Sequence, residues 1–141
     1  RWKSPVSKKT PRTKAHDTIQ KLVRLKAADD NGYCTCVTCG AVDKWNCFDG
    51  GHYIPKGCSS YWSLVEENVH PQCKGCNGFG MKYGTAAQQY TLYMVDTYGR
   101  EFVDEMERKK KDEVKYYKRD YEDMIKEWTE QIKQHLQRVG G

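Results

Sequence analysis

Cys36-Val-Thr-Cys39 and Cys73-Lys-Gly-Cys76 are two C-x2-C pairs that frame residues 40 to 72. A C-x2-C pair brings two thiolates into one tight turn, and two such pairs supply the four sulfur ligands of a tetrahedral structural Zn²⁺. The framed segment is longer than the roughly 15 to 20 residues between the pairs of a simple zinc ribbon. We therefore expect it to contain folded structure of its own.

Length and composition fit one small domain. The chain has 141 residues, of which 38% are hydrophobic and 30% charged, so a modest core would gain from a metal that cross-links it. Seven cysteines, four of them in C-x2-C pairs, favour metal ligation over disulfides. No apolar run is long enough to cross a membrane. We expect a protein of the cytoplasm that has no membrane partner.

The charge pattern allows a nucleic-acid partner. The net charge is +5, and basic residues precede the first acidic residue, Asp17. This arm could lie along DNA phosphates, although a solvated tail explains it as well. The candidate DNA-binding residues are Lys8, Lys9, Arg12, Lys56, Lys109 and Lys110.

Periodicity predicts an α+β fold. Residues 1 to 12 are expected to be an irregular arm, followed by a helix that ends before Asn31-Gly32 and covers the zinc knuckle with its apolar face. Residues 33 to 54 predict a β-hairpin that bends at Gly50-Gly51, and residues 55 to 67 a loop. The zinc-stapled domain is then residues 13 to 108.

Two more helices are predicted after the second cysteine pair. The first carries a stripe of Tyr90, Tyr93, Met94 and Tyr98 and ends at Gly99. The second, from 112 to 138 within a C-terminal region of residues 109 to 141, has an apolar seam along most of its length. That seam could pack on its own domain or pair with a second copy to make a homodimer.

The framed segment resembles the HNH, or ββα-metal, nuclease signature. The resemblance rests on Gly51-His52-Tyr-Ile-Pro55, then Asn68, then Asn77 directly after Cys76. It implies that His52 is the general base, that Asn68 ties the loop to the hairpin, and that Asn77 binds a catalytic divalent ion. Phosphodiester hydrolysis needs such a base to deprotonate water and a hard cation to offset phosphate charge.

The sequence departs from that signature at Gly51, where the wider superfamily carries a metal ligand. Asp49 and His70 are the candidate replacements, since alternation along a strand places Asp49 on the same face as position 51. Each has a structural alternative. Asp49 could satisfy backbone donors of the glycine bend, His70 could hold the loop, and Asn77 could cap the next helix.

A closer resemblance is to the phage NinG, or Rap, recombination family. It rests on Cys-x-x-Cys-Gly, Asp-x-Gly-His-Tyr and Asn-Val-His-x-Gln-Cys-x-x-Cys-Asn in that order, followed by Tyr98-Gly99. The same Asp-x-Gly-His sequence occurs in that family. The resemblance implies a structure-specific endonuclease for Holliday junctions or D-loops, with structural Zn²⁺ and catalytic Mg²⁺ or Mn²⁺. The alternative is a zinc-stabilised DNA-binding module without catalysis, for which Gly51 is the main argument.

Overall fold

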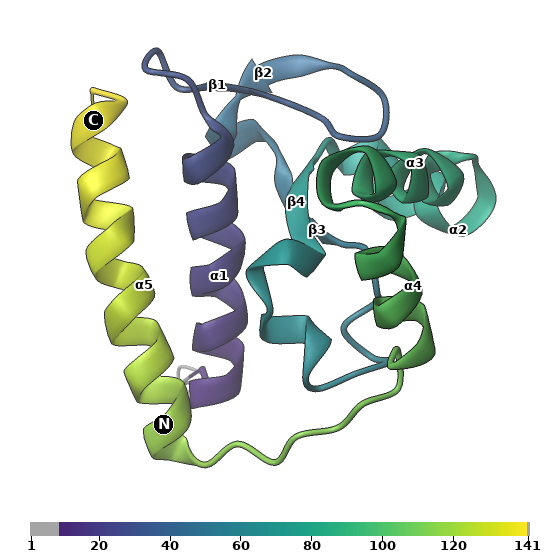
Figure 1. The fold of residues 1–141 in the computed structure, drawn as a ribbon. Helices are drawn as coiled ribbons and strands as arrows, with labels where there is room; N and C mark the ends of the chain where they lie inside the picture. Colours follow the sequence, from purple (N-terminus) through teal and green to yellow (C-terminus); the bar gives the residue numbers. More distant parts are fainter. Residues whose placement is uncertain (1–8, 141) are drawn as a thin grey trace, which may run out of the picture.

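The computed structural model describes residues 9–140, which form five α-helices and two small antiparallel sheets (Figure 1). The predicted α+β class is confirmed. In chain order the elements are α1 (Pro11–Ala27), β1 (Tyr33–Thr35), β2 (Val42–Lys44), β3 (Asp49–His52), β4 (Val69–Gln72), α2 (Met81–Tyr83), α3 (Ala86–Tyr98), α4 (Arg100–Arg108) and α5 (Lys118–Arg138). Short 3-10 turns lie at Trp45–Cys47, Trp62–Leu64 and Glu66–Asn68, and a π-helical turn at Cys76–Gly80. No helix among the described residues is long and apolar enough to cross a membrane.

Helix α1 begins earlier than the sequence predicted. The Thr10 side chain accepts a hydrogen bond from the backbone N–H of Thr13 at 3.2 Å, and Pro11 occupies the first turn. A threonine cap and an early proline both favour a helix start. Residues 11 and 12 therefore belong to α1 and not to an irregular arm.

Helices α1 and α5 lie side by side and run in the same direction (Figure 1). Leu22 and Leu25 of α1 form one buried apolar cluster with Trp128 and Ile132 of α5. At the shared end, the Arg138 guanidinium donates to the Leu25 and Ala28 carbonyl oxygens at 2.9 and 2.8 Å. The apolar seam of the last helix thus packs on its own chain.

The last helix begins at Lys118, so the predicted start at residue 112 was wrong. Residues 109 to 111 instead form a turn, and residues 112 to 117 form an irregular connection along the lower edge of the molecule in Figure 1. Trp62 Nε1 donates to the Lys109 carbonyl at 3.0 Å, and Ser60 Oγ donates to the Val114 carbonyl at 3.0 Å. These tertiary hydrogen bonds hold backbone groups that a helix would otherwise have paired.

Strands β3 and β4 pair with Asp49 opposite Gln72 and His52 opposite Val69. Gly50 and Gly51 lie within β3, so the predicted hairpin bend at these glycines was wrong. Close packing explains them instead. A Cβ at Gly50 would lie 2.7 Å from the Gln20 Cβ of α1, and one at Gly51 would lie 1.8 Å from Gln72 Oε1. No side chain fits at either position without a shift of its neighbours.

Helix α1 covers the β3–β4 sheet rather than the cysteines. Its buried face contacts both strands and α5. Ala28, just after the helix, joins the cluster that contains Cys34 and Cys36. The prediction that the apolar face covers the knuckle was therefore wrong.

Helices α3 and α4 form a second core with the segment after β3. The predicted stripe is confirmed: Tyr90 and Met94 are fully buried beside Ile54 and Trp62. α3 ends at Gly99, whose φ of 90° is a conformation that glycine adopts readily.

Candidate functional site

The four cysteines of the two C-x2-C pairs come together. The Sγ atoms of Cys36, Cys39, Cys73 and Cys76 all lie within 4.8 Å of one another, and the Cys39–Cys73 pair is 3.8 Å apart. A tetrahedral zinc with Zn–S bonds of about 2.3 Å has S–S edges of about 3.8 Å. All seven cysteines of the chain are free of disulfides. The cluster could thus hold a structural metal such as zinc, as the spacing predicted.

Hydrogen bonds to sulfur favour the thiolate form at Cys36. The Cys73 backbone N–H donates to Cys36 Sγ at 3.3 Å, and the Thr38 hydroxyl lies 3.3 Å from the same sulfur. Burial alone would raise the pKa of Cys36, but these hydrogen bonds outweigh it and lower the pKa to about 6. A thiolate is the form that binds a metal.

The other three cysteines lie outside the cluster. Burial raises the pKa of Cys34 to about 11, which disfavours its thiolate. Cys47 and Cys58 are exposed. None of the three belongs to the four-sulfur group.

Asp49 and Asn77 meet beside the cluster. Asn77 directly follows Cys76, and Asp49 is the first residue of β3. Asn77 Nδ2 donates to Asp49 Oδ2 at 3.1 Å. Lys74 Nζ donates to Asp49 Oδ1 at 2.8 Å. Burial alone would raise the pKa of Asp49, but the hydrogen bonds from Lys74 and Asn77 and the Lys74 and Arg24 charges hold it below its usual value. The carboxylate is ionised at neutral pH.

His70 points away from this pair into a group of tyrosines. The Tyr90 hydroxyl donates to the Gly51 carbonyl at 2.7 Å, so it accepts from His70 Nδ1 at 3.0 Å. His70 Nε2 then accepts from the Tyr98 hydroxyl at 2.7 Å. Burial lowers the pKa of His70 to about 4. Both ring nitrogens are engaged, which is the arrangement of a structural histidine.

His52, the last residue of β3, lies on the opposite face of the strand from Asp49 because side chains alternate along it. Its Nε2 lies 2.9 Å from the Ser63 carbonyl oxygen. A carbonyl only accepts, so Nε2 carries the hydrogen and Nδ1 keeps its lone pair. Burial lowers the pKa of His52 to about 4, against a smaller opposing effect of the Ser63 hydrogen bond. The ring is neutral at pH 7.

The Asn68 side chain connects the segment just after β3 to the turn at Trp62–Leu64. Its Oδ1 accepts from the Ile54 backbone N–H at 2.7 Å, and its Nδ2 donates to the Ile54 and Trp62 carbonyls, each at 3.0 Å. The side chain is fully buried. Asn68 therefore links the backbone at Ile54, just after His52, to the turn at Trp62 through hydrogen bonds that an apolar side chain could not make.

The space beside Gly51 is filled by Gln72. The Gln72 side chain is fully buried, and its Oε1 faces Gly51 with no hydrogen-bond partner in the described part of the chain. Its Nε2 donates to Thr38 Oγ1 at 3.3 Å. Thr38 in turn contacts Cys36 Sγ. Gln72 thus links β3 and β4 to the cysteine cluster.

His16 is a site neighbour that the sequence analysis missed. Its ring lies 6.2 Å from the His52 ring, and its buried Nδ1 has no hydrogen-bond partner among the described residues. Burial, then the charges of Lys56 and Arg12, lower the pKa of His16 to about 4. Its spacing from Ile19 and Val23 could have placed it on the sheet-facing side of α1.

The candidate DNA-binding residues divide into two groups. Arg12 and Lys56 carry charges close enough to affect the histidine pair. The others described are paired with acids: Lys9 with Asp17 at 2.6 Å, Lys109 with Glu105 at 2.7 Å, and Lys110 with Glu107 at 3.9 Å. Lys8 lies outside the described residues. Arg12 and Lys56 therefore have the stronger case for phosphate contact.

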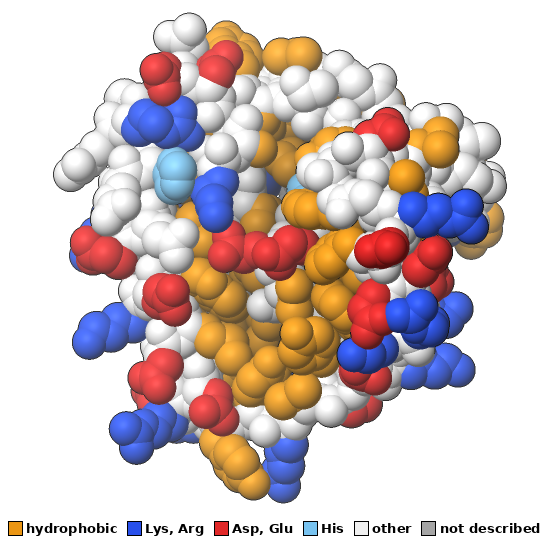
Figure 2. All heavy atoms as spheres, viewed as in Figure 1, with side chains coloured by type: hydrophobic (Ala, Val, Ile, Leu, Met, Phe, Trp, Pro, Cys, Tyr) orange, Lys and Arg blue, Asp and Glu red, His pale blue; other side chains and the backbone are white. Residues whose placement is uncertain are grey.

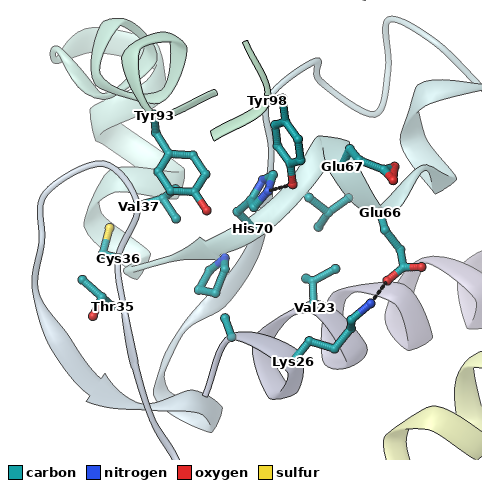
Figure 3. Close-up of a pocket in the computed structure, with 13 residues that line it drawn as sticks. Val23, Lys26, Thr35, Cys36, Val37, Glu66, Glu67, His70, Tyr93 and Tyr98 are labelled. Atoms are coloured by element: carbon teal, nitrogen blue, oxygen red, sulfur yellow. Dashed lines mark hydrogen bonds and ion pairs between the residues drawn. The ribbon is translucent and has the colours of Figure 1, made fainter. Parts of the chain in front are cut away.

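A cavity of about 650 Å³ opens between α1, the loop after β1, β4 and the end of α3 (Figure 3). It is lined by His70, Tyr93 and Tyr98, with Glu66 and Glu67 on the same side, and by none of Asp49, His52 or Asn77. Figure 2 shows acidic side chains gathered at the middle of the face it draws. Lys26 also lines this pocket and pairs with Glu66 at 2.9 Å, which leaves Glu67 as the acidic group without an ion pair among the described residues (Figure 3).

The fold and the site define a small α+β protein with four cysteines placed so that they could hold a metal ion. The chain belongs to the NinG family, because the family model described as Bacteriophage Lambda NinG protein matches residues 2–138. The family suggests a role related to phage recombination. No curated protein and no solved structure matches the chain.

Proposed function

We propose that this protein is a metal-dependent DNA endonuclease that hydrolyses phosphodiester bonds in branched intermediates of phage recombination. One observation carries the proposal: the Asp49 carboxylate and the Asn77 amide, from a strand and from the cysteine knuckle, meet at 3.1 Å. Carboxylate and amide oxygens are ligands that hard divalent cations prefer. The family supplies the recombination context.

Asp49 and Asn77 would hold the catalytic ion. Asn77 uses Nδ2 toward Asp49, which leaves its Oδ1 atom for a metal. Lys74, whose side chain is 71% exposed, can move away from Asp49 when a cation binds. A Mg²⁺ or Mn²⁺ ion held there would offset the charge that develops on the phosphate. We exclude His70 from this role because tyrosine hydroxyls engage both of its nitrogens.

His52 would act as the general base. The Ser63 carbonyl fixes the tautomer in which Nδ1 can accept a proton from water. The water oxygen then attacks phosphorus, and the bond to the leaving oxygen breaks. A phosphate beside the ring raises the pKa of His52 toward neutrality, since an anion stabilises the imidazolium. Arg12 and Lys56 would bind that phosphate, and Asn68 would keep the His52 segment in place.

The mechanism requires Asp49 and His52 to reach the same phosphodiester. They lie on opposite faces of β3, three positions apart, which is about 10 Å along a strand. Within the described residues β3 pairs with β4 on one edge only. Gly50, Gly51 and His52 are buried, so DNA binding would have to expose His52. We propose that the substrate lies along the edge of β3 that pairs with no strand, because that edge is closest to side chains of both faces.

The test is cleavage of a four-way junction and of linear duplex by the zinc-loaded protein with Mg²⁺ or Mn²⁺. Asp49→Asn, Asn77→Ala and His52→Ala should each reduce the rate, with a loss for the base of roughly 10²- to 10⁴-fold. Asp49→Asn keeps the shape of the side chain, so its loss would not reflect unfolding. His135→Ala, on α5 away from the site, is the matched control and should cut normally.

Two results would overturn the proposal. If the wild type cleaves DNA no faster than His52→Ala, the protein is not a nuclease, and the alternative of a zinc-stabilised DNA-binding protein without catalysis is favoured. Loss at His52 with full activity in Asp49→Asn would show that the Asp49–Asn77 pair holds no catalytic ion. Junction binding by each variant, measured without a divalent ion, separates failure to bind from failure to cut.

A further inference from the structure

Two aromatic rings stand out from the surface just beyond the cysteine knuckle. Phe79 is 71% exposed and Tyr83 is 74% exposed. They are four positions apart on a helical segment, and their ring centroids lie 5.1 Å apart with planes tilted by 47°. Neither ring belongs to a core cluster of the described residues. A paired apolar surface that contributes nothing to the core needs another explanation.

The segment that carries the rings is fixed to the metal centre. Gly84 N–H donates to the Gly80 carbonyl at 3.1 Å, and a Cβ at Gly80 would lie 3.2 Å from the Gly75 carbonyl oxygen. Residues 74 to 83 therefore form one continuous helical run that starts within the knuckle. The rings hold a set position relative to Asn77, which is two residues before Phe79.

The segment itself carries two lysines and no acidic residue, although Lys74 is paired with Asp49 of β3 at 2.8 Å. Between Gln72 and Asp96 the sequence contains no Asp or Glu, and its charged residues are Lys74 and Lys82. Both lysines are exposed. The surface around Gly75 and Gly78 is open, because a Cβ at either would meet nothing within 4 Å. Exposed aromatic rings beside lysines are the combination that binds single-stranded nucleic acid, through stacking and phosphate contacts.

We propose that Phe79 and Tyr83 form a stacking site for unpaired bases of DNA, positioned beside the proposed ion site at Asp49 and Asn77. Linear duplex buries its bases in the stack, whereas a branch point exposes some of them. The two rings would therefore give the protein its preference for branched over linear DNA. This inference rests on the proposed function, since it names how that site selects its substrate.

Binding without cleavage tests the inference. The probe is a four-way junction with 2-aminopurine next to the branch point, compared with a linear duplex of the same arm sequence, in buffer without divalent ions. In the Phe79→Ala/Tyr83→Ala variant, junction affinity should fall by roughly 10- to 100-fold, as expected for losing base–aromatic stacking. Duplex affinity should stay unchanged, and the 2-aminopurine signal on binding should disappear.

Two variants serve as matched controls. Tyr83→Phe keeps the ring and should bind the junction like the wild type. Leu92→Ala removes an apolar side chain that is 58% exposed on α3, and it should also have no effect. Because all these side chains are exposed, none of the variants should lose thermal stability.

The outcomes separate the two proposals. If the double variant binds the junction like the wild type, or if the wild type binds junction and duplex equally, the stacking site is refuted even where cleavage is observed. Another outcome is that the wild type prefers the junction, the double variant loses that preference, and no metal supports cleavage. In that case the stacking site is supported and the proposed nuclease activity is refuted. A concentration-dependent dimer that the double variant abolishes, with junction binding intact, would assign the rings to self-association and overturn the inference.

Discussion

The α1–α5 pair and the knuckle region (residues 33–44 and 73–80) differ in what stabilises them. The helices bury Leu22, Leu25, Trp128 and Ile132 against one another. In the knuckle region β1 and β2 have three residues each, and the neighbouring buried cluster consists of Ala28, Cys34, Cys36 and Phe48. One region is held by apolar area, whereas the other has too little of it and depends on its four sulfurs.

The proposed active site lies on β3, between these two regions. Asp49 meets Asn77 on the knuckle side, and His52 lies beside His16 on the α1 side. Damage to one region should therefore disturb one half of the site first. The following changes test this division.

Loss of the metal should have the largest effect, and it should be confined to the knuckle region. Cys73→Ser removes one of four ligands, and structural zinc sites contribute on the order of 10 kcal/mol of folding free energy in small zinc peptides. We expect loss of bound zinc by elemental analysis and loss of amide hydrogen-exchange protection in the knuckle region. Amides of α1 and α5 should stay protected.

Cys58→Ser is the control for that change. Cys58 is exposed and lies outside the four-sulfur cluster, so zinc content and exchange should match the wild type. Equal loss of protection in the helices and the knuckle region of Cys73→Ser would contradict the division into two differently stabilised regions.

A cavity in the helical region should have the next largest effect, with the opposite distribution. Leu22 is fully buried, and Leu22→Ala should lower the free energy of unfolding by about 2 to 5 kcal/mol. A urea titration measures this free energy. Zinc should remain bound to the folded variant, which elemental analysis checks. Leu92→Ala, on an exposed surface, should change the free energy by less than about 0.5 kcal/mol. Zinc loss in Leu22→Ala under native conditions would show that the two regions fold as one unit.

The smallest predicted effect concerns the contact that joins the regions. Gly51→Ala should destabilise the protein by about 1 to 3 kcal/mol, because the new Cβ would overlap Gln72. Gln72→Ala in the same chain should recover part of the loss, so the two changes should be non-additive in urea unfolding. Gly57→Ala, where a Cβ meets nothing within 4 Å, is the control for backbone effects. If the effects of the two substitutions were additive, the destabilisation by Gly51→Ala would not come from overlap with Gln72.

Local pattern was sufficient for some elements and misleading for others. The stripe of α3 and its end at Gly99 follow from spacing within one helix. Gly50-Gly51 indicated a bend by the same local reasoning, yet the pair lies in a strand because α1 and Gln72 approach it closely. The apolar periodicity of the last helix extended the prediction back to residue 112, where Ser59, Ser60 and Trp62 hold the backbone in an irregular conformation.

The sequence by itself determined the two cysteine pairs, because a C-x2-C spacing brings two sulfurs together within one turn whatever surrounds it. It also determined the periodic helices and the candidate residues Asp49, His52, Asn68, His70 and Asn77. Which of these meet was decided by tertiary structure alone. The β3–β4 pairing and the knuckle bring Asp49 to Asn77, α3 and its tyrosines engage His70, and α1 places His16 beside His52. Contacts between segments far apart depend on how whole elements pack, and no local spacing encodes that packing.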